Sequence, residues 1–137
     1  MSMRNYAIQT YCFMLTDKEL FDLLKKYKGT NENIDTEDVK EIIENEDYYG
    51  ATEIAELLDF CYYGDIDGEF TSLDNNTQKT VDYECIVILY LKKDTLYDKY
   101  KDKDEIYDEI LCKLKDFDID KQYVAEHTGM FYGVYCG

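Results

Sequence analysis

The sequence contains no proline, a single histidine and a single arginine, and it has no long run of hydrophobic residues. Without proline, the turns depend on glycine and asparagine. The lone His127 has no second histidine, nucleophile motif or glycine-rich phosphate loop beside it, so we predict that the protein is not an enzyme. No stretch approaches the ~18 apolar residues of a membrane span, so we expect a cytoplasmic protein that binds no membrane.

The cysteines are few and widely separated. They lie at least 24 positions apart, and no CxxC pair occurs. This spacing suits neither a compact zinc site nor a small disulfide scaffold. Most of them lie in apolar runs, which predicts buried, reduced thiols and a protein without metal or cofactor. The five are Cys12, Cys61, Cys85, Cys112 and Cys136.

Acidic residues dominate the composition. Thirty-one Asp and Glu against 15 Lys and Arg give a net charge of -16, while 45% of the residues are hydrophobic and 15% aromatic. The aromatic content favours a folded chain over a disordered one, and 137 residues suit a single domain over 1–137. The charge is uneven, because residues 31–84 hold seventeen of the acids and only two lysines.

Hydrophobic periodicity and capping signals predict four helices. Thr16 and Glu19 form the T-x-x-E capping box of the first, which precedes leucines at helical spacing. Asp35 is placed to cap the second helix and Asp102 the last. The predicted helices lie near 16–28, 35–46, 52–62 and 102–115.

Runs of β-branched and aromatic residues predict the strands. They lie at 6–13, 85–91 and 130–136, with a shorter one near 69–73. The run CIVILYL at 85–91 is continuously apolar, which suits a central strand covered on both faces. A short helical turn is expected at 94–97. The order β-α-α-α-β-β-α-β predicts an α+β domain, with an antiparallel or mixed sheet and helices mostly on one face.

The most unusual segment is 34–50, which holds seven carboxylates and one lysine. On a helix, Glu37, Glu41, Glu44 and Tyr48 form one stripe opposite the apolar positions. Like charges at i,i+3 and i,i+4 cost ~0.2–0.5 kcal/mol per pair, and nothing local compensates for them. Three interpretations follow: an ordinary solvated face, a face that docks on a basic partner, or a cation site.

Two features favour the docking interpretation. The acids continue through the next helix and loop, and tyrosine pairs at 48–49 and 62–63 interrupt them, as at many interface hot spots. The alternative is that one ring of each pair packs in the core while its neighbour is exposed. The predicted partner-binding residues are Glu37, Asp38, Glu41, Glu44, Asp47, Tyr48, Tyr49, Glu53, Glu56, Asp65, Asp67 and Glu69.

The loop at 63–74 partly matches the calcium-binding EF-hand pattern. With Gly68 at position 6 of the pattern, Asp65 and Asp67 occupy two ligand positions, but Tyr63 replaces the first ligand. Asp74 at the last position is shorter than the usual glutamate. We therefore predict no dedicated metal site here.

No motif identifies a family. In charge and size the chain resembles the DNA-mimicking anti-restriction and anti-CRISPR inhibitors of phages, which is an analogy of composition. A cleft that neutralises phosphates attracts any rigid polyanion. We therefore predict an acidic inhibitor, cytoplasmic in a bacterial host, that docks on a basic nucleic-acid-processing protein and binds no nucleic acid itself. The alternatives are an immunity protein against a basic nuclease toxin, and a small-molecule sponge or enzyme with a tyrosine-lined pocket.

Overall fold

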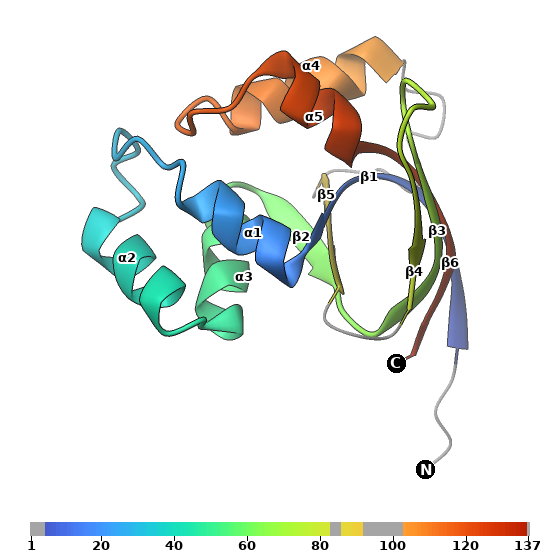
Figure 1. The fold of residues 1–137 in the computed structure, drawn as a ribbon, viewed down its shortest axis with the longest axis horizontal. Helices are drawn as coiled ribbons and strands as arrows, with labels where there is room; N and C mark the ends of the chain where they lie inside the picture. The colour runs from blue at the N-terminus through green and yellow to red at the C-terminus, as the bar shows by residue number, and fades with distance from the viewer. Residues whose placement is uncertain (1–4, 83–85, 92–102, 137) are drawn as a thin grey trace.

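The structure, a computed structural model, describes residues 5–82, 86–91 and 103–136. Within them the chain forms an α+β fold, and the predicted fold class is confirmed (Figure 1). The strands are β1 (Asn5–Thr16), β2 (Phe60–Tyr63), β3 (Ile66–Ser72), β4 (Gln78–Val81), β5 (Ile86–Leu91) and β6 (Thr128–Cys136). The helices are α1 (Asp17–Leu24), α2 (Thr36–Glu44), α3 (Tyr48–Leu57), α4 (Lys103–Lys113) and α5 (Lys121–His127).

All six strands belong to one antiparallel sheet, in the order β2-β5-β1-β6-β3-β4. The two central strands, β1 and β6, come from opposite ends of the chain and pair from Asn5 with Cys136 to Phe13 with Thr128. The apolar strand β5 lies between β2 and β1, as its sequence predicted.

The sheet is strongly curled. Only residues 82–85 join β4 to β5, although β1, β6 and β3 lie between these two strands in the sheet. In a flat sheet β4 and β5 would be ~19 Å apart, beyond the ~17 Å that this connection spans when fully extended. The sheet therefore has to bend, and Figure 1 shows it curving around an oval.

Glycines allow β3 and β6 to pair closely within this curl. A Cβ atom on Gly129 would lie 2.0 Å from the Thr71 carbonyl oxygen, and one on Gly133 would lie 2.1 Å from the Asp67 carbonyl oxygen. Both distances are far inside van der Waals contact. The tight β3–β6 pairing thus requires residues without side chains at these positions.

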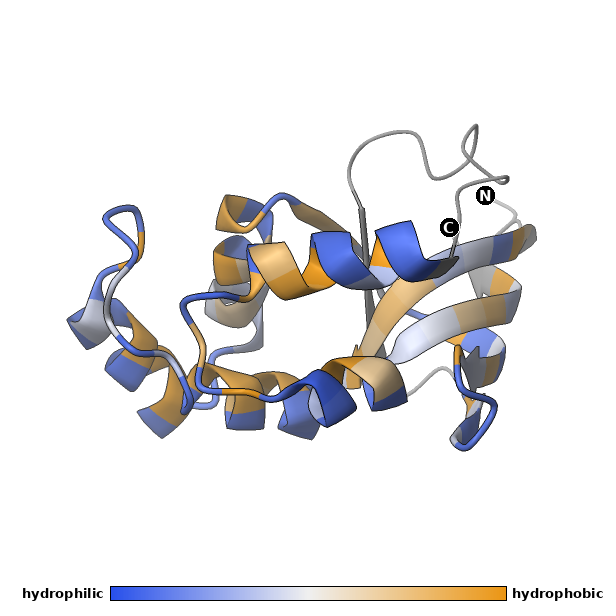
Figure 2. Ribbon diagram, turned by 90° about the horizontal axis from the view of Figure 1, so that it is seen from above, coloured by the Kyte–Doolittle hydropathy of each residue, from blue (hydrophilic) through white to orange (hydrophobic). Residues whose placement is uncertain are grey.

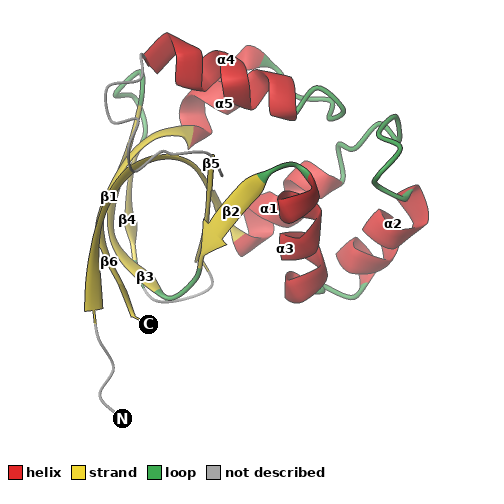
Figure 3. Ribbon diagram, turned by 180° about the vertical axis from the view of Figure 1, so that it is seen from behind, coloured by secondary structure: helices red, strands yellow, loops and turns green. Residues whose placement is uncertain are grey.

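The helices of the described residues cover part of the outer face of the curl, with α1, α2 and α3 grouped on one side and α4 and α5 over the top (Figure 3). Hydrophobic stretches alternate with hydrophilic ones along the helices, so each has an apolar side to bury (Figure 2). The main core joins all five helices to Phe13, Leu15 and Phe60. A smaller core lies on the opposite face and contains Ile8, Cys12, Met14, Ile66, Phe70, Val81 and Phe131.

The predicted helix at 52–62 is wrong at both ends. α3 begins at Tyr48, because the side chain of Asp47 caps it by accepting a hydrogen bond from the Gly50 N–H at 3.0 Å. It ends at Leu57. Asp59 then takes a positive φ of 64°, and Phe60 begins β2, where it pairs with Leu91 of β5. The glycine at position 50 thus lies inside the helix.

Other predicted boundaries also shift. α1 ends at Leu24 and α2 at Glu44, earlier than predicted, while β3 starts at Ile66. The sequence did not predict β4 or α5, which are short and mostly polar. The helical turn at 94–97 and the cap at Asp102 lie outside the described residues.

The cysteine prediction holds in part. Cys12, Cys61 and Cys112 are free, and burial raises the pKa of the Cys12 thiol. The prediction of burial is wrong for Cys112, which is exposed because it lies away from the face of α4 that buries Ile106 and Ile110, and Cys61 is only half-buried. The side chains of the other two cysteines lie outside the described residues.

Candidate functional site

The acidic face is built on α2. Asp35 caps this helix by accepting a hydrogen bond from the Glu37 N–H at 2.9 Å, and Val39 and Ile42 are buried. Glu37, Asp38, Glu41 and Glu44 are all exposed, as predicted. Glu37 and Asp38 lie in the first turn, where the helix dipole favours negative charge. Glu41 and Glu44 lie beyond the first turn, so the dipole of α2 does not stabilise their negative charges.

An acidic groove of about 370 Å³ runs between α2 and α3. Its carboxylates come from both helices and the turn between them, and are those of Asp38, Glu41, Asp47 and Glu53. Ile42 and Ile54 also line the groove and are buried. A Cβ atom on Gly50 would lie 2.8 Å from Ile42 Cγ1, so a glycine at this position lets the two helices approach. The groove therefore presents four acids above an apolar floor.

Two apolar side chains stand exposed on α3. Tyr49 retains 69% of its surface and Leu57, which lines the groove, retains 52%. Tyr48 instead is half-buried and packs against the main core, so it does not join the stripe of α2 as predicted. The pair at 48–49 thus has one packed ring and one exposed ring, which is the alternative that the sequence left open.

One lysine, Lys40, lies on these two helices. Its Nζ atom is 3.6 Å from Glu37 Oε1, and both side chains are largely exposed. Exposed pairs of this kind contribute less than ~1 kcal/mol. Lys40 therefore leaves most of the negative charge uncompensated.

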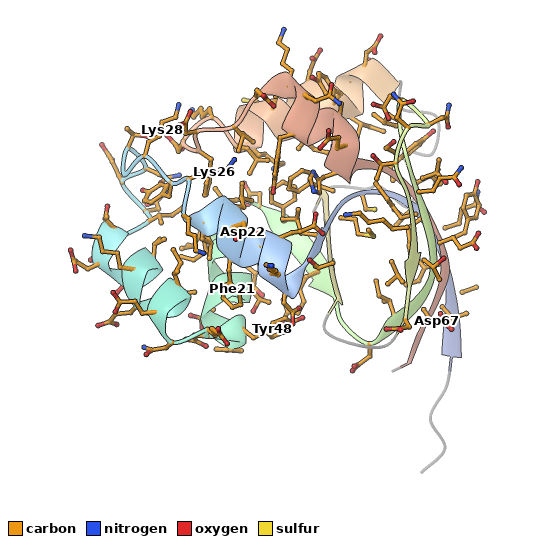
Figure 4. The ribbon with its side chains drawn as sticks, viewed as in Figure 1. Phe21, Asp22, Lys26, Lys28, Tyr48 and Asp67 are labelled. Atoms are coloured by element: carbon orange, nitrogen blue, oxygen red, sulfur yellow. The ribbon has the colours of Figure 1, made fainter. Side chains whose placement is uncertain are left out.

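The predicted partner-binding residues divide into two groups. Nine lie on α2, α3 and the turn between them. Asp65, Asp67 and Glu69 lie on β3 and the turn before it, and Figure 4 shows Asp67 on the curled sheet, well apart from Tyr48. None of these three residues lines the acidic groove.

Sequence reasoning missed a charged cluster centred on Glu19. This residue completes the predicted capping box with Thr16, and Lys79 Nζ lies 3.1 Å from both of its carboxylate oxygens. Burial by itself would raise the pKa of Glu19, but hydrogen bonds from His127, Lys79 and the Thr16 backbone lower it to about 2. Glu19 therefore joins α1 to β4 and to the end of α5.

His127 is buried and hydrogen-bonded at both ring nitrogens. Its Nδ1 atom lies 2.8 Å from the Tyr123 carbonyl oxygen and its Nε2 atom 2.6 Å from Glu19 Oε2. A carbonyl and a carboxylate both accept hydrogen bonds, so the ring is held between two acceptors. Glu19 and His127 contact each other, Lys79 and the Tyr123 carbonyl oxygen, so this cluster holds α1, β4 and the end of α5 together.

The loop that resembles an EF-hand forms a turn and then enters β3. Asp67 lies in that strand, and Asp74 accepts a hydrogen bond from Ser72. Across residues 5–82, 86–91 and 103–136, no three His, Cys, Asp or Glu side chains are grouped as metal ligands. In the same residues, no helix has the length and apolar character needed to cross a bilayer.

Two further pockets of the described residues are each lined by a single tyrosine. Tyr48 lines the one beside α1, and Tyr123 lines the one beside α5. Comparisons with protein families, with curated proteins and with solved structures found no match for this chain. Its function therefore has to be argued from the geometry and charge described above.

Proposed function

We propose that the protein is an acidic inhibitor that docks through α2 and α3 on a basic, nucleic-acid-binding protein. Its carboxylates take the place of phosphates in the partner's cleft. The interaction involves no catalytic step and no direct contact with nucleic acid. We place it in the cytoplasm of a bacterial host, where phage anti-defence inhibitors act.

The acidic groove carries this proposal. Asp38 and Glu41 on α2, Asp47 in the turn and Glu53 on α3 line the groove around an apolar floor. Fixed carboxylates on two packed helices present charge with a defined spacing, as phosphates do along a nucleic acid strand. A cleft lined by Lys and Arg would be attracted to such an array.

The exposed apolar residues support a docking role for the same surface. Leu57 lies on the groove wall, and Tyr49 lies at the start of the same helix. Complementary charge mainly raises the rate of encounter, whereas desolvated aromatic and aliphatic contacts set how long a complex lasts. The α2–α3 surface offers both kinds of contact.

The test replaces Glu37, Glu41 and Glu44 with glutamine. The variant should fold with equal or slightly higher stability, because it removes like-charge neighbours without touching the apolar side of α2. Immobilised wild-type protein should capture a basic target from bacterial lysate at ~50 mM salt and lose it at ~300 mM salt. It should also block nucleic acid binding by the purified target, and the triple variant should do so more weakly.

The matched control removes three charges from the other acidic group, through Asp65→Asn, Asp67→Asn and Glu69→Gln. This variant has the same net charge as the first but keeps every acid of α2 and α3. It should inhibit like the wild type. Equal inhibition by all three proteins would overturn the proposal, and a nuclease toxin as the captured target would assign the protein to the immunity class.

A further inference from the structure

A pocket of about 480 Å³ opens between α1 and the turn that joins α2 to α3. Its apolar walls are the half-buried side chains of Phe21, Ile43 and Tyr48, which come from three different helices. Figure 4 shows Phe21, Asp22 and Tyr48 around this part of the molecule. The volume falls within the ~300–1,000 Å³ of ligand pockets, so a whole side chain of a partner fits inside.

The rim of the pocket is charged. Asp17, Asp22 and Glu46 contribute three carboxylates, and Lys18 and Lys25 contribute two ammonium groups. Lys25 Nζ lies 3.6 Å from Asp22 Oδ1, with side chains 59% and 50% exposed. Such an exposed pair is weak, so a cation with better geometry displaces it readily. An anion would meet three carboxylates on a protein of net charge -16.

Glu46 occupies a backbone position that usually holds glycine. Its φ is 48°, and its N–H bonds the Ile43 carbonyl oxygen while the Asp47 N–H bonds that of Ile42, as in a Schellman motif. A residue with a side chain is strained there, and glycine is not. The chain thus holds a carboxylate on the pocket rim at a position where glycine would be more stable.

We propose that this pocket receives an arginine side chain of the basic partner, an inference that rests on the proposed function. The planar guanidinium stacks on Phe21 and Tyr48 and pairs with the carboxylates of Asp22 and Glu46. The methylene stem packs against Ile43. A lysine offers no planar group for stacking, and an uncharged side chain forms no ion pair.

The test uses capped tripeptides that differ only in the middle residue of glycine–X–glycine, with X as arginine, lysine or citrulline. Citrulline has the shape of arginine without its charge. Backbone amide NMR signals report binding at each position. The arginine peptide should give saturable shifts at Phe21, Ile43 and Glu46, lysine should bind about two- to fivefold more weakly, and citrulline should not bind.

Four variants separate a binding role from a structural one. Glu46→Gly should weaken arginine binding about two- to fivefold while raising the urea midpoint of unfolding, which a merely structural residue would not do. Phe21→Leu keeps an apolar wall and should remove the preference for arginine over lysine. Lys25→Met frees Asp22 and should tighten binding. Asp67→Asn, which lies far from the pocket, should leave binding unchanged.

Two results would overturn the arginine pocket. One is an equal response to the arginine and lysine peptides in the wild type and in Phe21→Leu. The other is a set of shifts confined to the acidic groove between α2 and α3. Both measurements use the isolated protein without its partner. A negative result therefore rejects the arginine pocket alone, and the triple glutamine variant still tests the proposed function.

Discussion

Glu19 Oε2 accepts a hydrogen bond from His127 Nε2 at 2.6 Å, across 108 positions of sequence. This contact joins the first turn of α1 to the point where α5 ends and β6 begins. The carboxylate also binds Lys79 on β4, so one side chain fixes three elements around one end of the curled sheet.

Glu19→Gln should lower the free energy of unfolding by about 2–3 kcal/mol, because the buried imidazole of His127 and the ammonium of Lys79 lose their anionic partner. Glutamine at this position still completes the capping box, so the loss reports on His127 and Lys79. Urea denaturation near neutral pH measures it. Glu53→Gln, on the exposed side of α3, is the control and should change stability by less than ~0.5 kcal/mol.

The same carboxyl predicts a loss of stability in acid. Its pKa is lowered from 4.5 to about 2 on folding, so the unfolded chain takes up a proton first. The stabilising contribution is complete above pH 4.5 and is lost as the pH falls towards 2. The stability difference between the wild type and Glu19→Gln should therefore shrink between pH 6 and pH 2.5, and a constant difference would contradict the assignment.

Gly129→Ala should destabilise the protein by about 3 kcal/mol or more, since the new Cβ atom would collide with backbone atoms of β3. Gly64→Ala is the matched control. Its Cβ atom would have Tyr48 Oη at 4.0 Å as its nearest neighbour. Thermal and urea unfolding of both variants should separate them clearly, and equal stabilities would mean that β3 and β6 do not approach as closely as described.

Tyr123→Phe should raise stability by about 1 kcal/mol. The Tyr123 hydroxyl is buried without a hydrogen-bond partner among the described residues, and burial with nearby Glu19 raises its pKa. Phenylalanine keeps the ring stacked on His127, whose centroid lies 4.3 Å away. In the control Tyr107→Phe, the lost hydroxyl donates to the Lys121 carbonyl oxygen at 2.9 Å, so stability should fall slightly.

Local signals predicted the elements whose stabilising contacts lie within one short stretch. The capping box at Thr16 and Glu19 and the cap at Asp35 involve residues two or three positions apart, and both are present. The strand β5, which lies inside the sheet, was predictable because its sequence is apolar throughout. In each case the deciding contact or composition is contained in the stretch itself.

The errors occur where distant contacts decide the outcome. Phe60 and Cys61 look like the end of an apolar helix, yet they form β2 because Leu91 and Tyr90 of β5 pair with them. β4 is polar, and its strand pairing with β3 makes it extended. The exposed stripe of α2 was predictable from periodicity, whereas the acidic groove depends on how α3 packs beside it.

The pairing of β1 with β6 also determines when the fold can be completed during synthesis. β6 is the last described strand to leave the ribosome, yet it lies between β1 and β3 in the sheet. Until it emerges, the β3–β4 hairpin has no neighbour through which to join β1. The edges of β1 and β3 that β6 covers therefore stay unpaired on the nascent chain until β6 has emerged, and this long-range pairing predicts slow folding and a need for protection from aggregation.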